Sequence, residues 1–292
     1  MNKKLIQYSI YPAFLIFSYG IYFLLINQFN LEVTIAVYIP IILALCGIYV
    51  LELTVSYRKE WVPNSKDLVN DFTYMAVIQV LLPKLLSFAI VIQLLAFIQS
   101  NNLSLEVYWF KDFSIFSQLI TMVFIADFFR YWLHRIFHEN ARLWPFHAVH
   151  HSPHKLYSIN VGRFHFVDKS IQYLFDTFPF ILLGVNDEVL ALYFLFYSVN
   201  GFFQHCNINI KLGFLNYVIS GPELHRWHHS MKTKESNSNY GNNLIIWDVI
   251  FRTRFLPKDK EVKELGLINR NYPLSFIQQL KTPFVKKLDK LQ

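Results

Sequence analysis

Four long apolar runs restrict this chain to folds in which helices cross a lipid bilayer. The runs cover residues 8–27, 33–53, 72–97 and 113–133. A spanning helix needs about 20 mostly apolar residues, so each run is long enough. Only 16% of the residues are charged and 54% are hydrophobic, whereas about a quarter of the residues are charged in an ordinary soluble domain. The sequence therefore predicts an all-α integral membrane protein with four transmembrane helices.

A fifth apolar region, residues 171–203, is interrupted by Pro179, Gly184 and the polar run 186–188. Because proline and glycine interrupt helices, we expect two shorter helices here, arranged as a broken hairpin. Two cysteines, Cys46 and Cys206, are too few for a disulfide framework and are expected to be packing residues.

Basic residues predict the orientation of the chain, because loops rich in lysine and arginine stay on the cytoplasmic side. Residues 28–32 and 99–110 contain no Lys or Arg. The opposite loops carry Lys3, Lys4, Arg58, Lys59, Lys66, Arg130, Arg135 and Arg142. We therefore expect a multi-pass protein of a bacterial inner membrane or the endoplasmic reticulum, with both termini cytoplasmic and the start of the chain retained as a span.

The same charge pattern bears on the choice of partner. The net charge is +7, and much of the excess lies in the loops predicted to be cytoplasmic and near the C-terminus, where anionic lipid head groups are the nearest partner. No nucleic-acid partner is expected.

Eight of the eleven histidines fall into three tight clusters. Within each cluster the residues are spaced at i and i+4, or at i, i+3 and i+4, so that each set lies on one helical face. The clusters are His134 and His138; His147, His150 and His151; and His225, His228 and His229. Unpaired polar groups are costly inside a membrane bundle, so eight converging imidazoles indicate bound metal. One ion takes about four to six ligands, and eight therefore suggest two ions.

The type of ligand alone does not choose among iron, copper, nickel and zinc. A zinc-protease H-E-x-x-H motif is missing after His138, and the chain has no paired E-x-x-H motifs. A histidine-rich metal carrier remains a remote alternative, although transport sites usually lie near the membrane midplane. A bis-histidine haem would need only two of these rings and would leave most of the imidazoles unexplained.

The three boxes resemble those of the fatty acid hydroxylase and sterol desaturase superfamily, specifically its bacterial or alkylglycerol-monooxygenase-like branch. The resemblance covers residues 113–255. It rests on the boxes H-x3-H, H-x2-H-H and H-x2-H-H, together with segments 127–135, 163–165, 204–205, 239–241 and 247–248. The orientation predicted from the basic residues places the first two boxes just beyond the cytoplasmic end of the fourth span. The third box joins them if residues 171–203 enter and leave the membrane on the same face, and the boxes then lie in a cytoplasmic helical cap. We therefore expect three parts: N-terminal transmembrane helices at 1–112, a catalytic domain at 113–255 and a basic cytoplasmic tail at 256–292.

What the resemblance implies is a non-haem di-iron oxygenase that uses O2 to hydroxylate a membrane lipid, whether a fatty acyl, sterol or ether lipid. Lipid desaturation is the alternative reaction. The chain shows no G-x-G-x-x-G motif, so electrons are expected from an external donor: a b-type cytochrome, a ferredoxin or a reductase.

The resemblance also extends the set of site residues. It implies His205 as a ninth ligand and His165 as a possible additional one, with no catalytic residues beyond the metal ligands. Asp127, Glu139 and Asp248 are candidate acceptors for ring N–H groups, although a solvated or capping role explains them equally well. Arg252 stands where the family usually has glycine, which puts the local turn in doubt.

Overall fold

The computed structural model describes residues 3–101, 110 and 112–285, and its regular structure is helical apart from three isolated β-bridges. Most of the loop 99–110 and the end of the predicted tail, 286–292, lie outside the described residues. The all-α prediction is therefore confirmed for the part of the chain that the structure describes.

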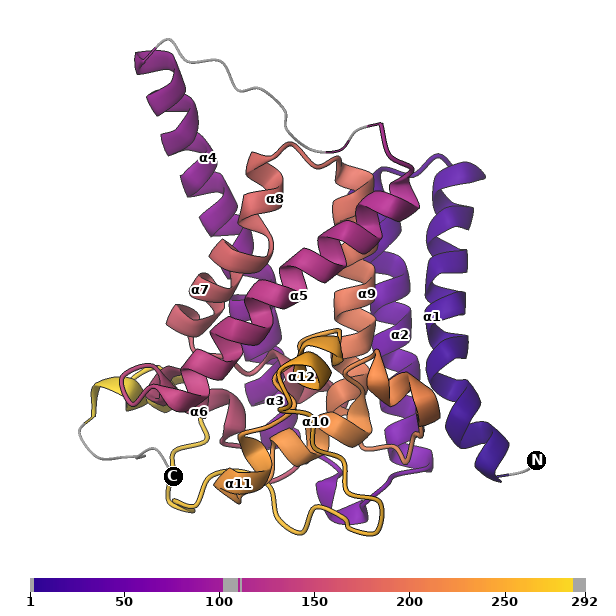
Figure 1. Ribbon diagram of the computed structural model, residues 1–292, viewed down its shortest axis with the longest axis vertical. Coiled ribbons are helices and arrows are strands. Elements are labelled where there is room, and N and C mark those ends of the chain that lie inside the picture. Colours follow the sequence, from indigo (N-terminus) through magenta and orange to yellow (C-terminus); the bar gives the residue numbers. More distant parts are fainter. Residues whose placement is uncertain (1–2, 102–109, 111, 286–292) are drawn as a thin grey trace.

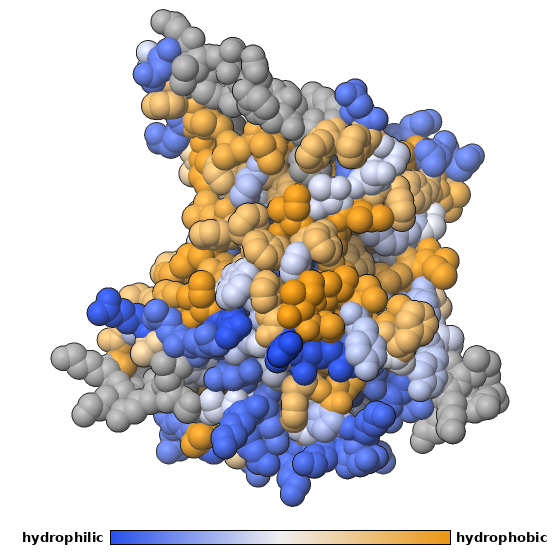
Figure 2. Space-filling view, viewed as in Figure 1, coloured by the Kyte–Doolittle hydropathy of each residue, from blue (hydrophilic) through white to orange (hydrophobic). Residues whose placement is uncertain are grey.

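An apolar layer forms one half of the molecule. It contains α1 (Lys3–Asn27), α2 (Val33–Thr54), α3 (Ser65–Tyr74), the π-helix η2 (Met75–Leu81), α4 (Leu82–Ser100) and α5 (Ile115–Glu139). Figure 1 shows α1 and α2 running antiparallel, with α5 crossing the layer obliquely. Figure 2 shows a belt of hydrophobic side chains over these helices and a hydrophilic base below it.

Three helical segments are long and apolar enough to cross a membrane: Gln7–Asn27, Val33–Thr54 and Ser65–Leu94. They match the first three predicted runs. The fourth predicted run forms most of α5, but this helix is not among the three, and it carries buried Asp127 and Arg130. Three candidate spans are thus present in the described residues, and a fourth stays a prediction.

The broken hairpin contains the predicted interruption but consists of three helices rather than the two expected. It comprises α7 (Phe166–Asp176), α8 (Phe178–Leu182) and α9 (Asp187–His205). Pro179 lies in the first turn of α8, where its missing N–H costs nothing, and Gly184 has a φ of 76° in the following turn. The side chain of Asn186 accepts a hydrogen bond from the backbone N–H of Val189 and caps α9.

Helix α9 is the central element, because it packs against α1, α2 and α5. Its buried Leu195, Val199 and Phe203 join residues of α1 and α2 in the largest apolar core. Since α9 ends at His205, this packing fixes the position of one candidate ligand.

Short helices and loops form a cap at the end of the layer where the N-terminus lies (Figure 1). The cap contains η1 (Lys59–Trp61), α6 (Trp144–His151), η3 (Ser158–Gly162), η4 (Gly213–Tyr217), α10 (Pro222–His228), α11 (Thr233–Ser236), α12 (Ile246–Ile250), α13 (Phe276–Gln279) and η5 (Thr282–Phe284). Val262, Leu265 and Tyr272 are buried, so the described part of the predicted tail packs onto the cap. The domain boundary at 256 stays a prediction.

Candidate metal centre

Four helices bring the candidate ligands together at the junction of the apolar layer and the cap. Helix α5 carries the first box near its C-terminal end, α6 carries the second, and α10 with the residue that follows it carries the third. His205 is the last residue of α9. Pro145 and Pro222 lie in the first turns of α6 and α10, where the missing N–H of proline leaves no helical hydrogen bond unmade.

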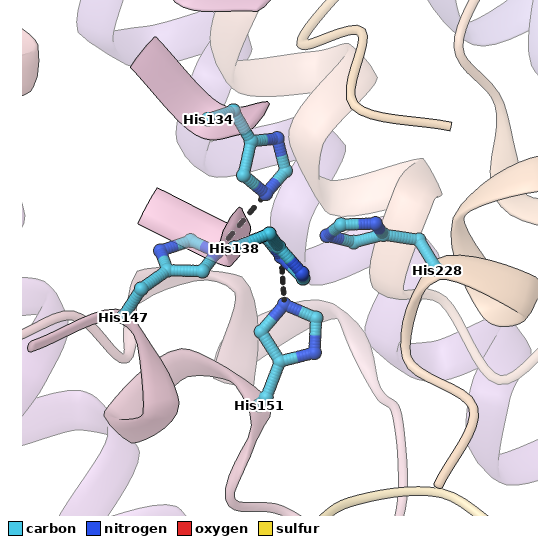
Figure 3. A group of neighbouring side chains, drawn as sticks. All are labelled: His134, His138, His147, His151 and His228. Atoms are coloured by element: carbon cyan, nitrogen blue, oxygen red, sulfur yellow. Dashed lines mark hydrogen bonds between the residues drawn. The ribbon is translucent and has the colours of Figure 1, made fainter. Parts of the chain in front are cut away.

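Nine histidines form two groups, within each of which the ligand nitrogens lie within 4.8 Å of one another. The first group is His134, His138, His147, His151 and His228, and the second is His150, His205, His225 and His229. The five rings of the first group face a common space (Figure 3). The second and third boxes are each divided between the groups, because residues at i and i+4 share one side of a helix while i+3 turns toward the other.

Backbone carbonyls settle the tautomers of several rings, because a carbonyl oxygen only accepts hydrogen bonds. His134 Nδ1 lies 2.7 Å from the carbonyl oxygen of Tyr240, and His147 Nδ1 lies 2.8 Å from a carboxylate oxygen of Asp168. His134 Nδ1 therefore carries the proton, and His147 Nδ1 does so when Asp168 is ionised, which leaves each Nε2 with a lone pair. These two Nε2 atoms are 3.0 Å apart. Two facing lone pairs repel, and a cation between them removes the repulsion.

The second group repeats this arrangement. His150 Nδ1 lies 3.2 Å from the carbonyl oxygen of Arg163, and His205 Nδ1 lies 2.7 Å from Asn160 Oδ1. The Nε2 atoms of His205 and His225 are 3.0 Å apart, and that of His229 is 3.2 Å from that of His150. His150 and His205 thus turn a proton outward and a lone pair inward, as metal ligation requires.

His228 provides independent support for a bound cation. Its Nδ1 lies 2.8 Å from the carbonyl oxygen of Ser238, while its buried Nε2 has no hydrogen-bond partner in the described part of the chain. Burial lowers the pKa of His228 to about 4 and lowers the pKa of His150 and His229 well below the usual value. The rings are therefore neutral near pH 7, and neutral imidazole is the form that binds metal. The residues present fit one metal ion in each group.

The acceptors that orient the rings differ from the three carboxylates expected. Asp127 accepts hydrogen bonds from Asn243 and from the backbone N–H of Leu244, Glu139 pairs with Arg135 on the surface, and neither binds a histidine. Asp248 accepts from the backbone N–H groups of Tyr240 and Gly241, so it holds the loop whose carbonyl receives His134 without touching the ring.

Asp168 is the carboxylate that contacts a ligand, and sequence reasoning missed it. Burial, opposed by nearby Arg130, raises the pKa of Asp168 to about 7. It lies 21 positions after His147, outside any box, and no local spacing singles it out.

His165, the possible additional ligand, lies outside both groups. Its Nδ1 accepts a hydrogen bond from the backbone N–H of Val167, which caps α7, and its Nε2 lies 3.2 Å from the carbonyl oxygen of Leu280. Both nitrogens are thus engaged away from the two groups.

A cavity of about 370 Å³ leads from the two histidine groups into the apolar layer. Most of its wall is apolar, with residues from α2, η2 and α9 such as Ile41, Met75 and Phe202. His134 and His147 of the first group line it, as do His150, His205 and His225 of the second. Its size is within the range of small-molecule sites, so an apolar ligand can reach both groups.

The residues of this site lie in a segment that is similar to known proteins. Residues 119–253 match the family model named fatty acid hydroxylase. The chain is 37% identical over 180 residues to ornithine lipid hydroxylase OlsE of Rhizobium tropici, a match that covers 62% of the chain and 54% of that relative. It is 28% identical over 221 residues to alkylglycerol monooxygenase of Danio rerio, covering 74% of the chain and 47% of the relative.

A third relative is methylsterol monooxygenase 2-2 of Arabidopsis thaliana, which is 26% identical over 161 residues, or 53% of the chain and 57% of the relative. The chain therefore spans about half the length of these curated relatives. No solved structure matches the chain significantly. The matched segment contains all three boxes and His205, so the candidate metal centre lies within the part of the chain that is similar to the fatty acid hydroxylase family model.

Proposed function

We propose that this chain is an O2-dependent monooxygenase that hydroxylates a membrane lipid at a pair of non-haem irons. The observation that carries the proposal is the convergence of nine neutral imidazoles, in two groups, at the end of one apolar cavity. The names of the relatives, which are hydroxylases and monooxygenases, support an oxidoreductase and favour hydroxylation over the alternative, desaturation.

Each histidine group would hold one iron, the first through five rings and the second through four. Bound iron supplies the O2 chemistry that attacks an unactivated C–H bond. The protein fixes several of the rings through the outward nitrogen, as Asp168 does for His147 and the Tyr240 carbonyl does for His134. The apolar cavity wall positions the lipid and excludes water from the reacting carbon. The electrons would come from an external donor such as a b-type cytochrome, a ferredoxin or a reductase.

The fold also supports a proposal for orientation. Helix α5 would complete the bilayer layer as an oblique fourth crossing, with its buried Asp127 and Arg130 turned toward protein. Charged loops lie beside the histidine end, including the loop that contains Arg58 and Lys59. By the positive-inside rule the cap, the histidine groups and the N-terminus would then be cytoplasmic.

Lipid mass spectrometry tests the proposed function. Cells that express the chain should gain lipids heavier by one oxygen, and cells that express a His150→Ala variant should not. Metal analysis of the purified protein should find about two irons per chain, because each group of rings is sufficient for one ion. A single stoichiometric zinc after growth with ample iron, or an unchanged lipid profile, would contradict the proposal.

A further inference from the structure

A second cavity, of about 240 Å³, adjoins the cavity that leads to the histidines and has a different lining. It lies between α4, α7, α8 and α9. Its wall contains Lys84, Lys169 and Asp176, together with the hydroxyl groups of Ser87 and Tyr173. We call it the side cavity. A charged chamber at the level of the apolar layer is costly to maintain without a ligand, and ionisable groups in such positions usually serve function.

The two cavities share part of their walls. Tyr38, Gln79, Val80, Phe194 and Tyr197 line both. The ammonium nitrogen of Lys84 lies 5.3 Å from the ring centre of Tyr38, and that of Lys169 lies 5.1 Å from the ring centre of Tyr197. Each lysine therefore stands over a tyrosine of the shared wall, so that the two positive charges flank the junction of the cavities.

Neither lysine has a carboxylate partner among the described residues, where no carboxylate oxygen lies within 4.0 Å of either ammonium. Lys169 is only 6% exposed, and the hydroxyl of Tyr197, at 3.0 Å, is the acceptor that it contacts. An ammonium has three N–H donors, so Lys169 keeps donors without an acceptor. Asp176 does not supply one, because it faces the guanidinium of Arg130 at 3.6 Å.

Lys84, on α4, also brings an ammonium without a carboxylate partner to the side cavity. It is the one charged residue between positions 72 and 94, within the candidate span Ser65–Leu94, and its side chain is exposed. An isolated ammonium at that depth is expensive in hydrocarbon, and the face of Tyr38 offsets only part of the cost. With Arg130 in the first cavity, the charged residues that line the two cavities are three cations and one carboxylate.

We propose that the side cavity binds the anionic oxygen group, a carboxylate or a phosphate, of the lipid that this protein oxidises, with Lys169 and Lys84 as its specificity-determining residues. The claim that the bound lipid is oxidised rests on the proposed function. The claim that the side cavity binds an anionic group does not. Tyr197 and His205 are eight residues apart on α9, which corresponds to about 12 Å along the helix. The oxidised carbon is therefore several bonds away from the anionic group.

Equilibrium binding to the purified, iron-loaded full chain tests the inference. The probes are three radiolabelled amphiphiles with the same chain, hexadecanoate, hexadecyl phosphate and hexadecanol, added to protein in a non-ionic detergent. The wild-type protein should prefer at least one of the two anions to the alcohol by about 10-fold or more, the effect of a charged hydrogen bond. Which anion binds more tightly identifies the chemistry of the head group.

The Lys169→Met variant should lose this preference and keep its affinity for hexadecanol, while Lys169→Arg should retain most of the preference. Lys260→Met, which removes an exposed lysine from a cap loop, is the matched control and should behave as wild type. Equal affinity of the wild type for all three probes would overturn the inference. So would a Lys169→Met variant that weakens all three equally, because the lysine would then act only on the fold.

The binding assay and the lipid analysis test the two proposals independently. Anion-selective binding without any gain of oxygen in cellular lipids would support the side cavity and contradict the monooxygenase. A gain of oxygen in lipids, with no anion preference in the binding assay, would do the reverse.

Discussion

His228 gives the most direct test of metal binding at a single residue, because its Nε2 is buried and has no hydrogen-bond partner among the residues that the structure describes. His228→Ala removes one of the five rings of the first group. Iron affinity at that group should fall by more than the 10–100-fold that loss of an outer hydrogen-bond partner typically costs. His165→Gln is the control and should keep its iron, since His165 lies outside both groups. Iron per chain measured after dialysis against a chelator decides the result.

Asp168 should tune the metal site without belonging to it. Asp168→Ala leaves His147 without the acceptor for its Nδ1 proton, so iron affinity and turnover should fall about 10–100-fold. Glu139→Ala is the matched control, because that carboxylate pairs with Arg135 on the surface and contacts no ligand. Chelator competition on the two purified variants measures their iron affinities. Equal iron retention in the two variants would remove Asp168 from the account of the site.

In the turn after the third box, Arg252 adopts a backbone conformation that favours glycine, the residue usual at this position in the family that the chain resembles. Its φ is 60°, in the left-handed region that costs a non-glycine residue about 1–2 kcal/mol. Arg252→Gly should therefore raise the free energy of unfolding by about 0.5–1 kcal/mol, after the greater freedom of glycine in the unfolded chain is subtracted. Thermal unfolding in detergent measures the change, and a lower midpoint than wild type would contradict it.

At the scale of elements, α9 links the membrane layer to the metal centre, and its Gly201 keeps the cavity open. Gly201 lines the cavity, and an added Cβ would lie 3.5 Å from Val161. Gly201→Leu should fill the space that the lipid needs and lower turnover at least about 10-fold, equivalent to 1.4 kcal/mol of binding. Iron content should be unchanged, because no ligand is moved.

Gly20→Leu on α1 is the matched control for this prediction, since an added Cβ there meets nothing within 4 Å. It should leave turnover at the wild-type rate. Loss of iron in Gly201→Leu would show that the substitution disturbs the fold rather than the cavity, and normal turnover in that variant would exclude this cavity as the lipid path.

The sequence predicted those features of the elements that depend on neighbouring residues in the chain, but not those that depend on tertiary packing. The i, i+3 and i+4 spacing of each histidine box is local, and it predicted that the rings of one box share a helix. The prediction that each box lies on a single face holds for the first box, whereas the second and third are divided between the two groups. Helix geometry turns the i+3 ring of a box away from the i and i+4 rings, but which histidines of other helices each ring meets is set by how α5, α6, α9 and α10 pack, and no spacing encodes that packing. The pairing of His147 with Asp168 joins α6 to α7 for the same reason.

The fourth predicted span shows a different limit. Hydropathy reports composition, and α5 is apolar along much of its length, yet Asp127 and Arg130 are buried against α7 and the 242–244 loop. Partners supplied by tertiary packing make these charges tolerable. Such partners are invisible to a window that moves along one chain segment.

At the scale of the whole molecule, the proposed orientation makes a prediction about access from the two sides of the membrane. Gln28, in the loop between α1 and α2, and Lys234, in α11 of the cap, are both exposed and lie at opposite ends of the apolar layer (Figure 1). If the cap is cytoplasmic, a membrane-impermeant maleimide added to intact cells that carry the protein in their plasma membrane should label Gln28→Cys. It should label Lys234→Cys only after the membrane is permeabilised.

The two cysteine variants are best made in a Cys46→Ser background, because Cys46 is exposed in α2 whereas Cys206 is buried. Each variant serves as the control for the other, since both carry one new exposed thiol and differ in the end of the molecule that bears it. Labelling of Lys234→Cys in intact cells would place the histidine groups on the outer side. A cytoplasmic electron donor would then have no direct access to them, and the proposal that such a donor supplies the electrons would fail together with the orientation.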